Sequence, residues 1–350
     1  MPHKSHLPKI ATVSVIAAVL AFVGILLSWK HIRPQPVLPP AVASEPSVFV
    51  ATSPLTGLPI PPERATLPIL AVMVENAPLA RPQSGLSKAD IVYEATVEGG
   101  ITRFMALYQS EEADVVGPVR SARTYFAEIV REYDAWYAHV GGNADALVLI
   151  SKYKLNNLDQ FRISKPFWRD AQRQRERGFE HSVYADTNKL REYVSVEATS
   201  FLPWTFTPEA EAKDRGVAGS FVVPFSTPTY DAMWDYSPAS NTFKRVLAGH
   251  VAFTDAKNGE QIEVKNVIIQ YVNMEPMPNP ARGDEGALNM ELIGSGSGIL
   301  LRDGKSIPLT WKKTKTGERT QYSDASGNPL AFAPGKIWVE LAPPGSLILK

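Results

Sequence analysis

The fold is decided by LPILAVMVE, residues 67–75, and by ADIVYEATVEGGITRFMALYQ, residues 89–109. Three apolar runs, 67–75, 89–95 and 101–109, are rich in β-branched and aromatic residues, and Pro, Gly and Ser separate them. Runs of this length and composition are typical of buried or half-buried strands. We therefore expect three strands here, in a domain that mixes strands and helices.

Helical spacing follows these strands. Gly117 and Pro118 break the chain in GPVRSAR, residues 117–123, and apolar residues then recur at helical spacing from Phe126 onward. This pattern predicts a helix that begins just after Arg123. Shorter helices are expected near residues 144–153 and 187–194.

The second half of the chain has a different pattern. Short strand candidates are separated by Gly, Asn, Asp and Pro, which favour turns; they lie at 220–225, 243–247, 263–272, 298–301, 307–311 and 337–341. The expected fold class is therefore α+β. A mixed α/β N-terminal domain at 65–200 precedes a smaller β-rich C-terminal domain at 201–350.

The N-terminus contains an uncharged apolar run of about the length that spans a bilayer as a helix, residues 10–29. A cleaved signal peptide is the alternative, since Ala41-Val42-Ala43 resembles a cleavage site, but it lies well beyond the run. We expect residues 1–33 to form an uncleaved transmembrane anchor. The proline-rich residues 34–64 read as a semi-rigid spacer.

Composition excludes several classes of function. The chain has no cysteine, which removes zinc-thiolate sites, iron–sulfur clusters, thiol nucleophiles and disulfides. Lys+Arg and Asp+Glu both number 36, so the basic excess of a nucleic-acid-binding protein is missing. The sequence also lacks a phosphate-binding loop, a dinucleotide fingerprint, a nucleophile elbow and an HExxH zinc motif. We expect no metal and no cofactor.

GPVRSAR raises an electrostatic question. Arg120 and Arg123 are placed at the start of a helix, where the helix dipole is positive and cations are unfavourable. A negative group should therefore meet them. The preceding segment supplies two carboxylates, Glu94 and Glu98, and it also carries two more arginines, Arg81 and Arg103.

This Arg/Glu cluster has two interpretations. The arginines and carboxylates either form structural ion pairs that tie strand ends to the helix, or they form a recognition site for an anionic ligand. Histidines and an amide add ligand-binding candidates: His139 and Asn143 in HVGGN, and His181 in a charged stretch. His139 is read first as a hydrogen-bonded core residue.

Several stretches of the chain resemble the DUF3048 family: PLTGLP, ARPQSGLSKADIVYEATVEGGITRF, GPVRSARTYF, HVGGN, EHSVYADTNKL, GSGSG, RDGK, TWKK and PGKIWVEL. The resemblance runs from about Pro54 to the end of the chain. It implies two adjoining domains exposed outside the cytoplasmic membrane. Many members resemble lipoproteins with an acylated cysteine, which this chain lacks; the apolar run at 10–29 stands in its place.

From these observations we expect a single-pass cell-membrane protein whose soluble part is extracytoplasmic. Its Arg/Glu cluster would bind an anionic or carboxylate-bearing envelope ligand, such as peptidoglycan, or an envelope protein partner. One alternative is a cell-wall-acting hydrolase or lyase with Glu94 or Glu98 as general acid, assisted by His181 or His139. The other is a non-catalytic scaffold for envelope membrane proteins.

Overall fold

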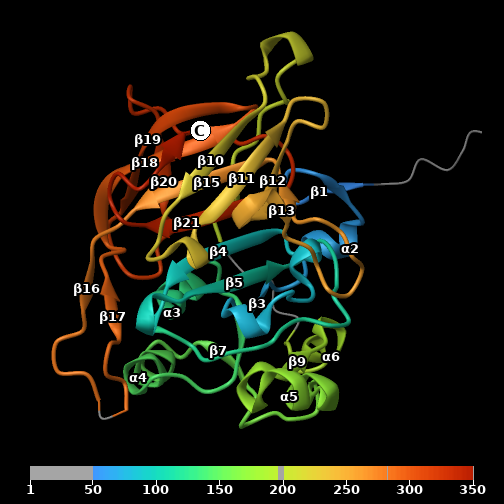
Figure 1. Ribbon diagram of the computed structural model, residues 1–350, viewed down its shortest axis with the longest axis vertical. Coiled ribbons are helices and arrows are strands. Elements are labelled where there is room, and N and C mark those ends of the chain that lie inside the picture. Colours follow the sequence, from blue (N-terminus) through green and yellow to red (C-terminus); the bar gives the residue numbers. More distant parts are fainter. Residues whose placement is uncertain (1–49, 196–200, 282, 350) are drawn as a thin grey trace, which may run out of the picture. The chain divides into compact units, whose positions relative to one another are not determined.

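A ten-stranded sheet organises the protein (Figure 1). The computed structural model describes residues 50–195, 201–281 and 283–349, and strands from both halves of this range enter the sheet. In spatial order they are β20 (Gln321–Ser323), β19 (Lys305–Lys313), β18 (Gly294–Arg302), β15 (Asn266–Tyr271), β21 (Ile337–Ala342), β4 (Ile91–Thr96), β5 (Thr102–Tyr108), β3 (Leu70–Glu75), β6 (Trp136–His139) and β7 (Asn156–Asp159).

The three strands predicted from the apolar runs are confirmed as β3, β4 and β5. β5 pairs antiparallel with β3 on one side and with β4 on the other. Every residue of the three strands is buried. They read as continuous apolar runs because both faces of the sheet are covered.

Strand β21, near the C-terminus, joins the two halves of the chain. It pairs in parallel with β4 on one side and with β15 on the other. The two domains predicted at 65–200 and 201–350 stay a prediction. Strands of both ranges share one hydrogen-bonded sheet in this structure. β4 would become an edge strand without β21.

A six-stranded sheet covers one face of the ten-stranded sheet. It contains β13 (Val251–Ala252), β12 (Thr242–Leu247), β11 (Ala232–Ser237), β10 (Gly219–Val223) and β22 (Ile348–Leu349), and β14 (Glu263–Val264) pairs with β12. Trp234 of this sheet packs against Trp338 of β21, with ring centroids 5.3 Å apart. Two-stranded ladders complete the β-structure: β1 (Ala51–Thr52) with β2 (Pro59–Ile60), β8 (Phe167–Arg169) with β9 (Val183–Ala185), and β16 (Met274–Pro276) with β17 (Leu288–Met290).

Few helices accompany these sheets. The predicted helix after GPVRSAR is α3 (Thr124–Glu132), and α4 (Ala144–Lys152) and α6 (Thr187–Arg191) lie where short helices were expected. Buried residues of α3 and α4, including Phe126 and Ile150, join the core on the face opposite the six-stranded sheet. Among the described residues, two α-helices were not predicted: α5 (Ala171–Arg177) in the charged stretch, and α2 (Pro62–Ala65).

The proline-rich segment differs from a pure spacer at its C-terminal end. Within its described part, residues 50–64, β1 and β2 pair and Leu55 is fully buried. The predicted anchor at 10–29 lies outside the described residues. None of the helices in the described ranges is long and apolar enough to cross a membrane.

Candidate functional site

The candidate site lies where several strands end together. β3, β4, β6, β7 and β21 run in one direction, and β5 runs against them. The carboxyl ends of the parallel strands therefore meet the start of β5 at one edge of the sheet. In open α/β sheets this edge is where ligands usually bind, and polar side chains gather there in this chain.

Arg123 is held by Glu98. Its Nε donates to both carboxylate oxygens, at 2.7 and 2.9 Å, and its Nη2 donates to Oε2 at 2.5 Å. Burial by itself raises the pKa of Glu98, but the hydrogen bonds and charge of Arg123 outweigh it and leave that pKa lowered. The carboxylate predicted to meet this arginine is thus Glu98, in a fork geometry that only arginine provides.

Arg120 meets a carboxylate that the sequence analysis did not single out. Its Nε lies 3.2 Å from Oε1 of Glu75, the last residue of β3. The Nδ1–H of His181 donates to the other oxygen of Glu75 at 2.8 Å. His181 is buried, and its Nε2 lies 3.5 Å from Glu180. Glu75 therefore joins Arg120 to His181 at the strand end.

Arg103 has no such partner. It lies beside Glu75 in the β3–β5 register, yet Glu75 is engaged by Arg120 and His181. Its Nη1 donates to the carbonyl of Ser121 at 2.8 Å, while its Nε has no hydrogen-bond partner among the described residues. Arg103 is 6% exposed. Burial, and then the nearby charges of Arg123 and Arg120, lower its pKa to about 9.

Helix α3 adds a second source of positive potential. Arg123 is its N-cap residue, and no side chain caps the helix there. The first N–H groups of a helix need partners and carry partial positive charge. The edge therefore combines an uncapped helix start with three arginines, Arg103, Arg120 and Arg123, against two carboxylates, Glu75 and Glu98.

Glu94 belongs to a different network, so the expectation of one converging cluster needs correction. Side chains alternate along β4, and residue 94 faces the six-stranded sheet, where it is fully buried. It accepts from Thr102 Oγ1 at 2.7 Å and lies 3.0 Å from Arg245 Nη2. Arg245 also binds Glu340, the register partner of Glu94, at 3.0 Å.

Arg81 connects to this buried network rather than to Glu98. Its Nε donates to Asn76 Oδ1 at 2.9 Å, and the Asn76 amide donates to Thr102 at 2.7 Å. Its Nη2 donates to the carbonyl of Thr229 at 3.0 Å. Burial lowers the pKa of Arg81. These contacts tie the end of β3 to the short 3₁₀ helix Pro228–Tyr230 in the second half of the chain.

His139 and Asn143 hold the backbone in place. His139 is fully buried; its Nδ1–H donates to the Gly141 carbonyl at 2.7 Å, and its Nε2 lies 2.9 Å from Asn157 Oδ1. Burial lowers its pKa. Asn143 caps α4 by accepting from the Ala146 N–H at 3.1 Å. The interpretation of His139 as a hydrogen-bonded core residue agrees with this geometry.

Glu75, Arg245 and Glu340 were missed by the sequence analysis. Two of them had a local signal, because Glu75 ends the apolar run LPILAVMVE and Glu340 interrupts the apolar run IWVEL. A charge in a buried strand needs a partner. Arg245 had no such signal, since it lies on a strand of the other sheet.

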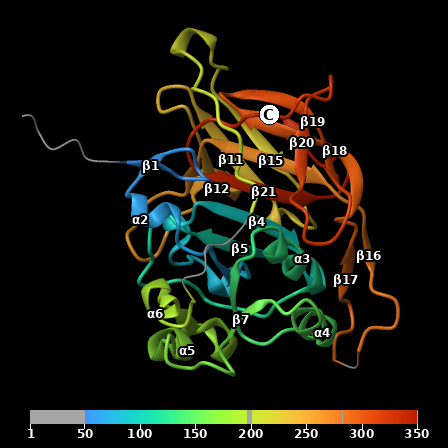
Figure 2. The same ribbon diagram turned by 180° about the vertical axis from the view of Figure 1, so that it is seen from behind.

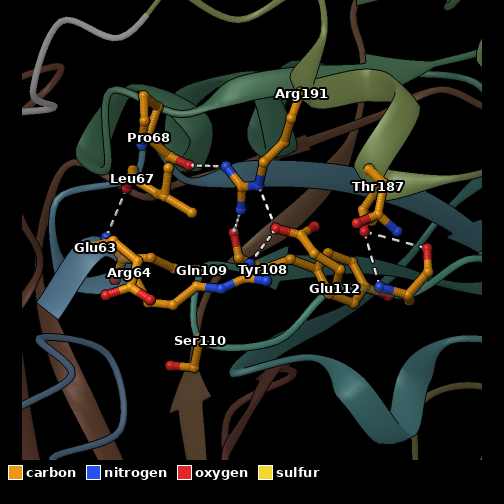
Figure 3. A network of polar contacts seen from close by, with 12 residues as sticks. Glu63, Arg64, Leu67, Pro68, Tyr108, Gln109, Ser110, Glu112, Thr187 and Arg191 are labelled. Carbon is orange, nitrogen blue, oxygen red and sulfur yellow. Dashed lines mark hydrogen bonds and ion pairs between the residues drawn. The ribbon is translucent and has the colours of Figure 1, made fainter. Parts of the chain in front are cut away.

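A further polar network lies at the opposite end of β5 (Figure 3). Glu112 binds both Arg64 and Arg191. Arg191 also donates to the carbonyls of Pro68 at 2.6 Å and Tyr108 at 3.2 Å. These bonds give Glu112 two arginine partners and join α2 and α6 to the sheet, so we read this network as structural.

Comparisons with known proteins agree with the expected family. The N-terminal domain model of the DUF3048 proteins of unknown function matches residues 55–200, and the C-terminal domain model matches residues 221–339. The putative lipoprotein YerB of Bacillus subtilis (strain 168) is 31% identical over 296 residues, which cover 83% of this chain and 86% of the relative. The crystal structure of YerB protein from Bacillus subtilis superposes with a TM-score of 0.73 at 28% identity, covering 86% of this chain and 99% of that chain. The chain therefore belongs to the DUF3048 family.

Proposed function

We propose that this protein is a membrane-associated envelope protein that binds a carboxylate-bearing ligand at the arginine edge of its sheet. The relative named a putative lipoprotein supports a membrane-associated envelope location. This chain has no cysteine to acylate, so the apolar run at 10–29 is the proposed anchor, with the soluble part on the extracytoplasmic side.

The binding proposal rests on Arg103, which is buried and has no carboxylate partner among the described residues. A buried charge without a charged partner costs several kcal/mol, and proteins otherwise pair such groups, as Glu112 shows here. Arg103 is buried beside Arg120 and Arg123, and no described carboxylate lies within ion-pair distance of it. An oxyanion bound at Arg103 would remove this cost.

Two arginines of this edge already bind carboxylates of the chain itself, which favours carboxylates over other anions as ligands here. Arg123 and Arg120 already bind the carboxylates of Glu98 and Glu75. The guanidiniums at this edge are therefore spaced to accommodate carboxylate groups. Envelope peptidoglycan presents carboxylates on its peptides and sugars. We therefore propose peptidoglycan as the ligand class.

Co-sedimentation with insoluble peptidoglycan sacculi tests this proposal. We expect Phe49–Lys350, which forms one compact unit, to sediment with sacculi and to lose binding when the sacculi carboxylates are amidated. Arg103→Gln should abolish binding and leave stability unchanged or raised. Arg175→Gln, which changes an exposed arginine, is the matched control and should bind normally.

The outcomes separate the three functions. Arg103→Gln that binds normally but is less stable would make Arg103 a structural residue and end the binding proposal. Release of soluble wall fragments would indicate a hydrolase or lyase, yet the lowered pKa of Glu98 opposes its use as a general acid. Absence of wall binding together with a cross-linked membrane protein would favour the scaffold.

A further inference from the structure

A cavity of about 430 Å³ lies at the β20 edge of the ten-stranded sheet. Figure 2 shows β19 and β20 together, away from β7 at the other end of the strand order. The arginine edge lies instead where β3 ends and β5 begins, and none of its residues lines this cavity. Sites for small molecules usually measure about 300–1,000 Å³, so the cavity is large enough to hold one.

Aromatic and aliphatic side chains form much of the cavity wall. Trp204 stacks on Tyr322, with ring centroids 5.7 Å apart and ring planes 9° apart, and Phe332 meets Trp204 edge-on at 4.8 Å. These three rings are buried and pack against one another, so the wall is preformed. Leu202 also lines the cavity and is 58% exposed. A ligand with an apolar body would remove this apolar surface from water.

The charged residues in the wall are cations. Lys312 and Arg319 line the cavity, and its lining residues include no aspartate or glutamate. Lys312 is exposed, whereas Arg319 is buried. The Arg319 guanidinium lies between the rings of Tyr133 and Trp204, 4.2 and 4.4 Å from their centroids. Its Nη1 donates to Glu132 at 3.1 Å. The guanidinium is therefore fixed in place at the cavity wall.

Behind Arg319, one carboxylate serves two buried cations. Glu132 also accepts from Nζ of Lys313, which is fully buried, at 3.0 Å, and from the N–H and hydroxyl of Thr320 at 2.9 and 3.0 Å. Four donors fill the lone-pair positions of a carboxylate. No other carboxylate of the described residues lies within 4.0 Å of either cation, so one buried positive charge is in excess. Arg319 Nε donates to the Leu202 carbonyl, and its Nη2 donates to no described residue.

We propose that this cavity binds a small amphipathic carboxylate, with its apolar body against the aromatic wall and its carboxylate on Arg319 Nη2. The bound carboxylate would balance the excess buried charge, and the low local dielectric constant strengthens such a pair. A neutral or cationic ligand would leave the excess charge in place. A free acyl chain and an apolar peptide C-terminus share this chemistry. This second site is independent of the ligand proposed for the arginine edge.

Calorimetry with probes that differ in one group tests the proposal on Phe49–Lys350, the compact unit that contains the cavity. The probes are decanoate, decanol, decyltrimethylammonium and acetate, and the dipeptide N-acetyl-leucyl-leucine represents a peptide C-terminus. We expect decanoate or the dipeptide to bind at least about tenfold more tightly than decanol, because a hydrogen bond between charged groups contributes that much. The tighter of the two identifies the source of the carboxylate. Acetate and decyltrimethylammonium should not bind.

Variants separate the charge from the apolar wall. Arg319→Met should abolish the preference for decanoate over decanol, and it should fold because Glu132 keeps Lys313 as a partner. Leu202→Ala changes an exposed wall residue and should weaken decanoate and decanol equally, by about threefold. Val217→Ala, at a residue 85% exposed outside the cavity, is the matched control and should change neither. A photoreactive decanoate should cross-link to residues 202–205 or 319–332.

Three results would overturn the proposal. Equal binding of decanoate and decanol to the wild-type protein would show that the excess charge does not select a carboxylate. Cross-links that map outside the cavity would place the ligand elsewhere. Decanoate binding that is lost with Arg103→Gln would assign it to the arginine edge. The comparison of head groups and the cross-link map use the wild-type protein, so they decide the matter even if Arg319→Met does not fold.

Discussion

Glu340→Gln should make the protein more stable at neutral pH. Glu340 and Glu94 are fully buried register partners on neighbouring strands, and they share one guanidinium, Arg245. Burial, and then the charge of Glu94, raise the pKa of Glu340 well above its usual 4.5. Glu340 is therefore protonated in the folded protein at pH values where the unfolded chain has already lost this proton.

The magnitude follows from proton linkage. Below pH 4.5, Glu340 is protonated in both states and its full contribution to stability is present. Above that pH, unfolding releases a proton, and the stability falls by about 1.4 kcal/mol per pH unit until the raised folded-state pKa is passed. Two pH units thus correspond to about 2.7 kcal/mol. Glutamine has no proton to release, so the variant escapes this loss.

The variant should be close to neutral in acid. Oε1 of Glu340 accepts from Trp234 Nε1 and Arg245 Nη1, each at 3.0 Å, and a glutamine carbonyl can accept both. The second N–H of the amide lacks an obvious acceptor and costs about 1 kcal/mol. The stability difference between variant and wild type should therefore begin slightly negative at pH 4.5, become positive as pH rises, and then level off.

Urea unfolding of Phe49–Lys350, followed by circular dichroism from pH 4.5 to 8, measures this difference. Arg245→Met is the comparison variant; it leaves two buried carboxyl groups without a guanidinium and should cost about 3–5 kcal/mol. A Glu340→Gln protein that is destabilised by the same amount at every pH would refute the reasoning, because the buried pair would then hold no extra proton.

Three further predictions concern contacts that the structure places. Arg123→Ala should lower the unfolding free energy by about 2 kcal/mol by removing the hydrogen bonds to Glu98. Because the pKa of Glu98 is lowered in the fold, calorimetry should show this loss of stability above pH 4.5 and no loss in acid. Residues 50–195 alone should give a disordered circular dichroism spectrum, because β4 loses β21; a cooperative melt would contradict this. Arg191→Ala should cost about 3 kcal/mol in urea unfolding by leaving Glu112 and two carbonyls short of donors, and an unchanged midpoint would show that Arg64 suffices.

Local pattern was enough for part of the candidate site. The break at Gly117–Pro118 and the spacing after it correctly placed Arg123 at a helix start. The positive end of a helix disfavours cations, so carboxylates near Arg120 and Arg123 could be predicted from the sequence. Each of the two arginines has a carboxylate partner in the structure. The identity of the second carboxylate, Glu75, did not follow, because proximity in sequence favoured Glu94.

Two properties of this protein were determined by its sequence alone: the strands β3 to β5, whose apolar runs can only be stable when buried, and the helix start at Arg123. Only the tertiary structure decided that β21 inserts beside β4, that Glu94 faces Arg245 rather than Arg120, and that Arg103 is left without a carboxylate. The physical reason is that secondary structure follows the local spacing of apolar residues. The partner of a buried charge depends on which strands become neighbours and on which face of the sheet each side chain lies. Here Glu94 and Arg245 are more than 150 positions apart in the sequence and still form an ion pair.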